Sequence, residues 1–186
     1  MKIAAFIFSG VMMLCCSCKH PYGAAPPAVY VKNVNPNLVK SDLGWQYKGK
    51  PFSGYMVEVE KNGKIVYQLP IMQGKENGKA IGFYNSGEKL LECMYVDGQK
   101  QGIYQHWWPN GNLRYLFSFQ KGKYQGKQLV YFPNGKLQGE KYYWMGKEEG
   151  PQKIWDSTGR LISNYAVKNN SVYGAISSQD CMPVLR

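Results

Sequence analysis

A spacing of 24 residues between glycines constrains the fold of this chain more than any other feature of its sequence. The first series is Gly54, Gly78, Gly102, Gly126, Gly150 and Gly174; the second is Gly63, Gly87, Gly111, Gly135 and Gly159; the third is Gly74, Gly98, Gly122 and Gly146, followed by Asn170. Asparagine is the best substitute for glycine in a left-handed backbone conformation, so Asn170 preserves the pattern. A fixed period of this length is typical of repeat proteins, in which one supersecondary unit stacks on the next. Function is therefore expected on a surface built by repetition.

Each repeat reads as a β-hairpin followed by a second turn. Asn110-Gly111 and Asn134-Gly135 lie between β-prone runs, which is a strong hairpin signal and predicts type I′ turns. After each turn apolar residues alternate with mostly polar ones, as in Leu113, Tyr115, Phe117 and Phe119, and this pattern indicates half-buried antiparallel strands. The predicted fold is all-β: an elongated antiparallel meander of about five 24-residue hairpin repeats, forming a twisted single sheet.

Two rows of aromatic residues accompany the repeats. Five places after each glycine of the first series stand Val59, Phe83, Trp107, Tyr131 and Trp155, and we expect this position to be buried. The next position holds Tyr84, Trp108 and Phe132, which should point to the opposite face because neighbouring strand residues alternate. Together with His106 and nearby lysines, these three residues form a candidate partner-binding strip. Alternatively, the sheet curls or is covered there by the spacer or the C-terminal tail.

The N-terminus resembles an export signal. Residues 1–17 hold a basic residue and a short apolar run before a cysteine cluster, and the run is too short to span a bilayer as a helix. The cluster is similar to the lipobox of bacterial lipoproteins and favours lipidation of Cys18, with Cys16 as the alternative; an ordinary secretory signal with incidental cysteines is the other interpretation. Residues 18–44, rich in proline, are expected to form an extended spacer, residues 45–174 the repeats, and residues 175–186 a C-terminal cap or tail.

The chain is strongly basic. Once Lys2 leaves with the signal, 22 basic residues face 12 acidic ones, a net charge of +10. Such a balance predicts attraction to anionic partners, although lysines spread through all repeats also serve solubility alone. Cys93 and Cys181 are about three repeats apart, too far to form a disulfide unless the C-terminal tail folds back along the sheet, so Cys93 is expected to be a buried apolar residue.

The sequence offers little for catalysis. His106 is the only histidine in the predicted strands, and no carboxylate or nucleophile neighbours it in sequence. No group of residues has the spacing of zinc or calcium ligands. We therefore expect no enzyme activity, no catalytic residue, no metal and no cofactor.

The repeat motif resembles the MORN repeat variant. Its best copies are Tyr131-Phe-Pro-Asn-Gly-Lys-Leu137 and Trp107-Trp-Pro-Asn-Gly-Asn-Leu113, and the resemblance extends over roughly residues 45–174. In bacteria such chains are often labelled YwqK-family antitoxins. The resemblance implies a scaffold or a membrane-associated protein-binding module and supplies no catalytic residue.

Together these features predict a lipid-anchored repeat protein of the bacterial cell envelope, placed at the outer membrane on its periplasmic or surface side. Its expected role is protein–protein interaction or scaffolding with an envelope protein. The alternatives are binding of an anionic lipid headgroup or polysaccharide, and antitoxin-like neutralisation of a partner. Nucleic acid is not an expected partner.

Overall fold

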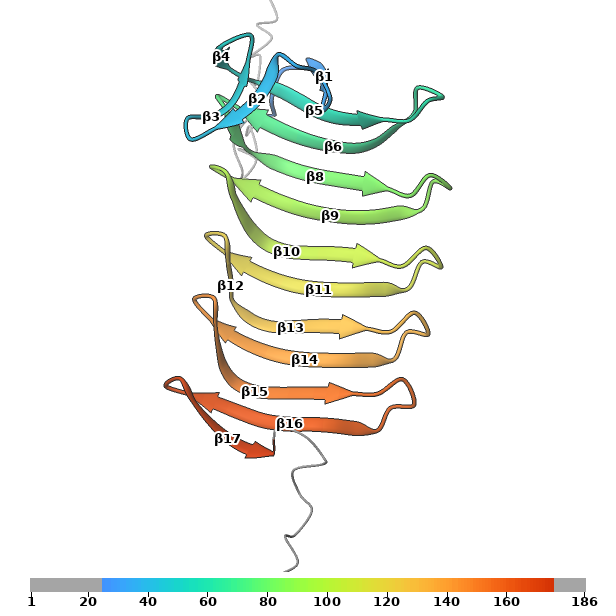
Figure 1. Cartoon of the computed structure of the whole chain (residues 1–186), viewed down its shortest axis with the longest axis vertical. Coiled ribbons are helices and arrows are strands. Elements are labelled where there is room, and N and C mark those ends of the chain that lie inside the picture. The colour runs from blue at the N-terminus through green and yellow to red at the C-terminus, as the bar shows by residue number, and fades with distance from the viewer. Residues whose placement is uncertain (1–24, 176–186) are drawn as a thin grey trace, which may run out of the picture.

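The computed structural model describes residues 25–175, which form 17 β-strands and no helix (Figure 1). The first nine strands are β1 (Tyr30–Lys32), β2 (Leu38–Ser41), β3 (Gly44–Tyr47), β4 (Lys50–Pro51), β5 (Gly54–Val59), β6 (Ile65–Met72), β7 (Lys75–Glu76), β8 (Gly78–Phe83) and β9 (Lys89–Val96). The remaining eight are β10 (Gln99–Trp107), β11 (Leu113–Gln120), β12 (Lys123–Tyr124), β13 (Gly126–Tyr131), β14 (Leu137–Trp144), β15 (Lys147–Trp155), β16 (Leu161–Lys168) and β17 (Ser171–Ala175).

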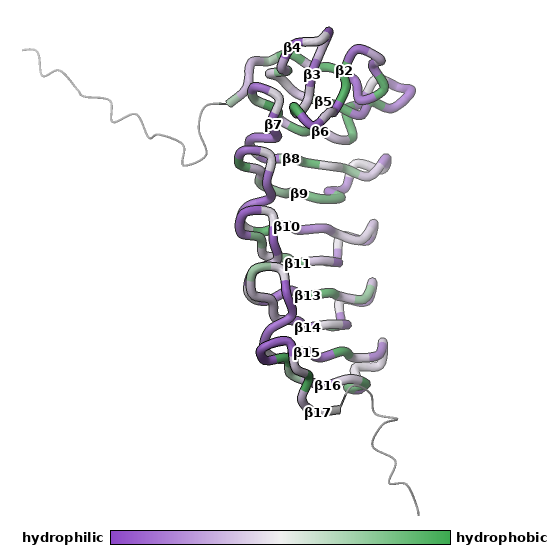
Figure 2. The backbone as a smooth tube through the Cα atoms, turned by 60° about the vertical axis from the view of Figure 1, so that its left-hand side comes forward, coloured by the Kyte–Doolittle hydropathy of each residue, from purple (hydrophilic) through white to green (hydrophobic). Residues whose placement is uncertain are grey.

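Fourteen of these strands form one long sheet. Its order is β1-β5-β6-β8-β9-β10-β11-β13-β14-β15-β16-β17, with β7 beside β6 and β12 beside β11. From β5 onward every pair is antiparallel and follows chain order, so the hairpins stack along one axis from the N-terminal to the C-terminal end (Figures 1 and 2). The prediction of an all-β meander of hairpin repeats is confirmed.

The N-terminal end differs from the prediction of a spacer reaching residue 44. Strand β1 pairs in parallel with β5, and β2, β3 and β4 form a separate three-stranded sheet at that end (Figure 1). The backbone N–H of Trp45 donates to the carbonyl of Gly74 at 2.7 Å, which joins the small sheet to the repeats. Val31 and Leu38 hold this segment against the repeats, because both side chains are buried in the core. This segment caps the first hairpin, as the terminal units of a repeat array require.

The two edges of the sheet use different turns. At the Asn-Gly turns only the glycine has a positive φ, for example 83° at Gly111, whereas a type I′ turn requires positive φ at both central residues. The prediction of type I′ turns at Asn-Gly is therefore wrong. Both central residues have positive φ at the opposite edge, as in Lys121-Gly122 at 49° and 74°. Asn170 has a φ of 62°, which confirms that it continues the third glycine series.

A β-bulge recurs at the same place in all five hairpins. The register shifts between Glu58 and Val59 in the first hairpin and between His106 and Trp107 in the third, with equivalent shifts in the others. Trp107 therefore pairs with Leu113, whereas His106 pairs with Tyr115. Because of this shift, the predicted core position no longer points to the face that carries the other apolar residues.

Burial is concentrated at the N-terminal end. Ile71 and Ala80 are fully buried, in a cluster that also contains Val31, Leu38, Phe52, Met56 and Leu69. After Cys93, the buried apolar residues of the described part of the chain are Phe119 and Val167. The position of Trp107 is not buried in any repeat: Phe83 is 36% exposed, and Val59, Trp107, Tyr131 and Trp155 are half-buried. The prediction that this position forms the core is wrong, because the bulge turns it away from the buried row.

Each repeat bends at the first glycine series. Strand β10 pairs with β9 through Gln99–Gln101 and again from Gln105, and the pairing is interrupted between these segments around Gly102, where φ is 75°. The short strands β7 and β12 are the corresponding first segments of two other repeats. The hairpins are therefore bent ribbons, and residues on both sides of the bend come close together.

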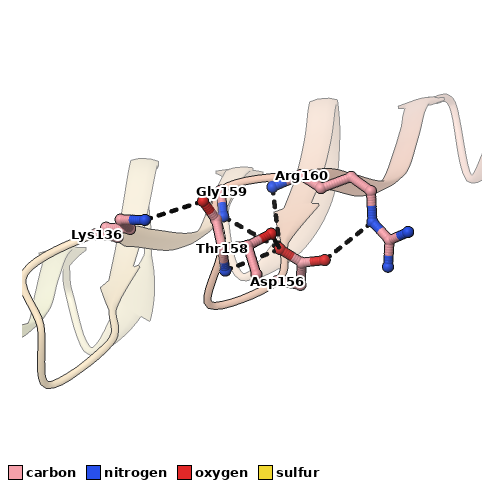
Figure 3. A network of polar contacts seen from close by, with 5 residues as sticks. All are labelled: Lys136, Asp156, Thr158, Gly159 and Arg160. Carbon is pink, nitrogen blue, oxygen red and sulfur yellow. Dashed lines mark hydrogen bonds and ion pairs between the residues drawn. The ribbon is translucent and has the colours of Figure 1, made fainter.

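The last Asn-type turn is held by a carboxylate in place of asparagine. Asn110 and Asn134 each accept a backbone N–H two residues on, but Thr158 stands at the equivalent position of the fifth repeat. There Asp156 Oδ1 accepts from the backbone N–H groups of Thr158, Gly159 and Arg160 and from the Thr158 hydroxyl, while Oδ2 accepts from Arg160 Nε (Figure 3). Lys136 of the preceding turn donates to the Thr158 carbonyl. The hydroxyl of Thr158, assisted by the donors of Arg160, lowers the pKa of Asp156 from 3.8 to about 2.

Asp156→Ala should lower the thermal unfolding midpoint at neutral pH, and the deficit should shrink as the solution is acidified. The pKa of Asp156 is lower in the folded state, so its contribution is complete above the ordinary value of 3.8 and is lost as pH falls through about 2. Thermal unfolding of both proteins across this pH range measures the deficit. Asp156→Asn is the matched control and should lose less, since it keeps an acceptor oxygen for the turn. A deficit that is constant with pH would contradict the assignment.

Candidate binding face

One face of the sheet carries a continuous row of aromatic rings, which we call the aromatic face. Its central members are Tyr104, His106, Tyr115, Phe117, Phe119, Tyr124 and Tyr143. Cross-strand pairing aligns Tyr104 with Phe117 and His106 with Tyr115. Tyr124 comes from the segment before the bend and lies 4.8 Å from Phe119 and 5.2 Å from Tyr143, between ring centroids. The bend thus links the rings of one hairpin to those of the next.

The small N-terminal sheet does not cover this row. In the described part of the chain, the second layer consists of β2–β4 at the N-terminal end, and the hairpins from β8 to β17 stack as a single layer (Figures 1 and 2). Phe119 is buried, and the other six rings are half-buried. Burial raises the pKa of Tyr104, which indicates that its ring is partly withdrawn from water.

Cations lie over these rings. Lys100 Nζ is 5.0 Å from the ring centroid of Tyr104 and 5.1 Å from that of Phe119, and the Arg114 guanidinium is 4.8 Å from that of Tyr115. Such contacts stabilise a cation beside an aromatic face without neutralising its charge. The aromatic face is therefore both apolar and positively charged.

Toward the C-terminal end the face carries a polar cluster. Glu148 accepts from Lys141 Nζ at 2.8 Å and from the hydroxyls of Tyr143 and Tyr165, each at 3.2 Å. Burial alone would raise the pKa of Glu148, but the hydrogen bonds and charge of Lys141, with the tyrosine hydroxyls, lower it. The carboxylate is therefore ionised and already paired, and it does not resemble a catalytic acid.

Two hollows lie beside the bend of the aromatic face. An open groove of about 610 Å³ is lined by Lys40, Glu76, Tyr95, Gln99, Lys100, Phe119, Lys123 and Tyr124, together with the glycines Gly98, Gly122 and Gly146. A smaller pocket of about 100 Å³ between Phe117, Gln128, Val130, Lys141 and Tyr143 shares Tyr124 with the groove. The groove has the volume of a small-ligand site but is shallow and open.

The predicted strip of Tyr84, Trp108 and Phe132 has a structural role at two positions. The Tyr84 hydroxyl donates to the carbonyl of Trp107 at 2.7 Å, and Trp108 Nε1 donates to the carbonyl of Tyr131 at 3.0 Å. Both bonds reach about one repeat along the chain and brace consecutive hairpins. Tyr84 also lines an open hollow of about 430 Å³ next to Tyr67. Trp108 and Phe132 are half-buried. Trp107 is half-buried as well, so the expected difference in burial between Trp107 and Trp108 is not found.

His106 lies within the aromatic row. It contacts Tyr104 and Tyr115, and its Nδ1 is buried without a hydrogen-bond partner among the described residues. Burial and, to a lesser extent, the charge of Arg114 lower its pKa, which favours the neutral imidazole. The described residues form no group of three potential metal-ligating side chains.

The other residues predicted from the sequence are the turn glycines and three cysteines. All five turn glycines, Gly63, Gly87, Gly111, Gly135 and Gly159, have positive φ as expected. Cys18 and Cys16 lie outside the described residues. Cys93 is buried, as predicted, and burial raises the pKa of its thiol to about 11, so it is an unreactive apolar residue. No helix in the described part of the chain has the length and apolar character needed to cross a membrane.

Sequence reasoning missed the groove residues. Lys100 and Tyr124 each stand two places before a glycine of the first series, and Gln99 and Lys123 stand three places before one. The sequence shows the 24-residue spacing of these residues, but it does not show the bend that turns them toward Tyr95 and Phe119. Alternation within a straight strand cannot predict a contact made across a bend.

By its fold this chain is a β-hairpin repeat protein whose one-layer sheet carries an aromatic, basic face. Comparison with protein families shows that the MORN repeat variant occurs twice in this chain, at residues 100–121 and 124–145. MORN repeats are generally repeat modules that bind proteins or membranes. These two segments supply Lys100, Phe119 and Tyr124 to the groove. A comparison with curated proteins found no match.

Proposed function

We propose that this chain is an exported, lipid-anchored, non-enzymatic module that binds an envelope protein through its aromatic face and scaffolds it near the membrane. The observation that carries this proposal is the row of half-buried rings from Tyr104 to Tyr143 on a single-layer sheet. A one-layer sheet leaves these rings partly accessible to a partner, and tyrosines contribute contact area at a low cost in side-chain entropy.

The charges beside the rings support a protein partner. Lys100 lies over Tyr104, and the Arg114 guanidinium contacts the rings of Trp108 and Tyr115. Tyrosine with arginine is a common composition of interface cores. The paired state of Glu148 and the neutral, hydrogen-bond-poor environment of His106 favour binding over catalysis. Antitoxin-like neutralisation would use the same face and differ in the partner alone.

The lipid anchor rests on the cysteine cluster before the repeats. Cys18 follows a short apolar run and a small residue, and lipidation there would place the capped end of the array toward the membrane. Labelling of cells with a fatty-acid probe tests this part: Cys18→Ser should abolish labelling and Cys16→Ser should not. Loss of labelling in Cys16→Ser alone would move the anchor to Cys16, and absence of labelling in the original chain would remove the anchor from the proposal.

Site-specific photocrosslinking tests the binding face. A photoreactive phenylalanine analogue at Tyr104 should give discrete crosslinked protein species in intact cells, whereas the same analogue at Ile103 should not. Ile103 is the matched control because it is the neighbouring residue, is 52% exposed and points to the opposite face. Crosslinks of equal yield from both positions, or from Ile103 alone, would overturn the assignment of the aromatic face.

A further inference from the structure

The groove at the bend shows which chemistry its partner carries. We propose that it binds an acidic polypeptide segment, whose carboxylates contact Lys100 and Lys123 and whose apolar side chains rest against the half-buried rings of Tyr95 and Tyr124. This inference rests on the proposed function and names the partner chemistry of the same face.

The charge of the groove is positive and partly unpaired. Its charged lining residues are Lys40, Lys100 and Lys123 against the single carboxylate of Glu76. Glu76 Oε1 accepts from Lys40 Nζ at 2.7 Å and from Trp45 Nε1 at 2.9 Å, so this carboxylate is already satisfied by the N-terminal sheet. Among the described residues, no carboxylate pairs with Lys100 or Lys123. Two cations thus remain for an incoming anion.

The backbone places these two lysines beside each other in consecutive repeats. The N–H of Gly122 donates to the carbonyl of Lys100 at 2.9 Å, so the turn that precedes Lys123 lies against the strand that carries Lys100. A Cβ on Gly122 would lie 3.7 Å from the Cβ of Gln99, an ordinary van der Waals distance, which shows how closely the turn approaches the strand. Because the hairpins stack in one direction, the two lysines follow each other along the open groove, where an extended chain can contact both.

The available hydrogen-bonding groups favour a polypeptide over a polysaccharide. Charged acceptors form the strongest hydrogen bonds with sugar hydroxyls, and the only carboxylate lining the described groove is occupied. Flat stacking of a sugar is also hindered, since Lys100 lies over Phe119 and the Tyr124 ring is tilted by 35° against Phe119. Carboxylates of aspartate and glutamate need donors alone, which the lysines supply.

The cations are lysines, and no arginine lines the described groove. Planar, bidentate recognition of phosphate is characteristic of arginine, whereas lysine acts as a mobile point charge. The groove is therefore less suited to a fixed phosphate headgroup than to carboxylates distributed along a chain.

Fluorescence anisotropy of a labelled oligoglutamate peptide with the purified full-length chain tests this inference. We expect binding that weakens as ionic strength rises to about 0.15 M, and no binding of the matched oligoglutamine peptide. The double variant Lys100→Met/Lys123→Met should weaken binding about tenfold, because two ion pairs are lost. Lys100→Arg/Lys123→Arg keeps both charges and should bind within about threefold of the original chain.

A second double variant controls for net charge. Lys61→Met/Lys153→Met removes two lysines elsewhere, one exposed near an Asn-Gly turn and one on the face opposite buried Gln152, and should leave oligoglutamate binding within about twofold. Thermal unfolding of every variant confirms that it is folded. Equal loss of binding in the two methionine variants would show that net charge, and not the groove, attracts the peptide.

Two further probes identify a wrong partner class. Tighter binding of polygalacturonate, or of phosphatidylglycerol vesicles, than of oligoglutamate at the same ionic strength would overturn the assignment to a polypeptide. If oligoglutamate fails to bind while Tyr104 still gives specific crosslinks in cells, the chemistry inferred for the groove is wrong and the proposed function stands. If the peptide binds but Tyr104 gives no crosslink, the groove assignment stands and the envelope-partner proposal fails.

Discussion

Replacing Ile71 by alanine should lower the free energy of unfolding by about 2–5 kcal/mol. Ile71 is fully buried near the end of β6, within the cluster that joins the first hairpin to the N-terminal strands. Removing three methyl or methylene groups there leaves a cavity that the bent sheet cannot fill. Denaturant titration followed by circular dichroism measures the loss.

Ile65→Ala is the matched control for this prediction. Ile65 begins the same strand but is 39% exposed, so its truncation should cost less than about 1 kcal/mol. Equal losses in the two variants would mean that the N-terminal cluster is not the stabilising core. A loss near zero for Ile71→Ala would show that the capping strands are not packed against β6.

Gln128→Leu should lower the free energy of unfolding by about 2–4 kcal/mol. Gln128 is 4% exposed and fills the interruption of the ladder at the bend. Its side-chain oxygen accepts from the Ser118 N–H at 2.9 Å, and its amide nitrogen donates to the Ser118 carbonyl at 3.1 Å. The side-chain amide thus replaces a missing backbone rung, and an apolar leucine would leave buried polar groups of the main chain unpaired.

Gln152→Leu provides a graded comparison. Gln152 occupies the equivalent position one repeat later and is fully buried, but its oxygen has no hydrogen-bond partner among the described residues. Its amide nitrogen donates to the carbonyls of Tyr142 and Gly150. Because burial of an unpaired oxygen already costs stability, Gln152→Leu should be less destabilising than Gln128→Leu. The reverse order, measured by the same denaturant titration, would contradict the role of Gln128 as a rung.

The candidate site shows where sequence reasoning reached its limit. Alternation of adjacent strand residues predicts a strip of Tyr84, Trp108 and Phe132, but Tyr84 and Trp108 use their polar atoms to brace the next hairpin. His106, predicted with them, lies in the aromatic row, where its contacts are Tyr104 and Tyr115. No pattern in the sequence predicts the contacts of Lys100 and Tyr124, because only the bend brings them to Phe119.

The number, length and order of the hairpins follow from local features of the sequence. Glycine or asparagine is required where φ is positive, as at Gly111, Gly122 and Asn170, and such backbone requirements are local and can be read from spacing. The alternation of apolar residues in β11 likewise predicts a half-buried strand. These features depend on one residue and its near neighbours.

Which residues share a face, and which segments are covered, depends on contacts between distant parts of the chain. The bulge beside Trp107 turns the expected core position away from the buried row. The bend at Gly102 brings Lys100 onto the rings of Tyr104 and Phe119. The burial of Val31 and Leu38 depends on contacts with residues far along the chain, such as Ile71. A shift of one residue in register, or a change of direction at a bend, alters every contact that follows, and its energy comes from packing between segments that no local pattern specifies.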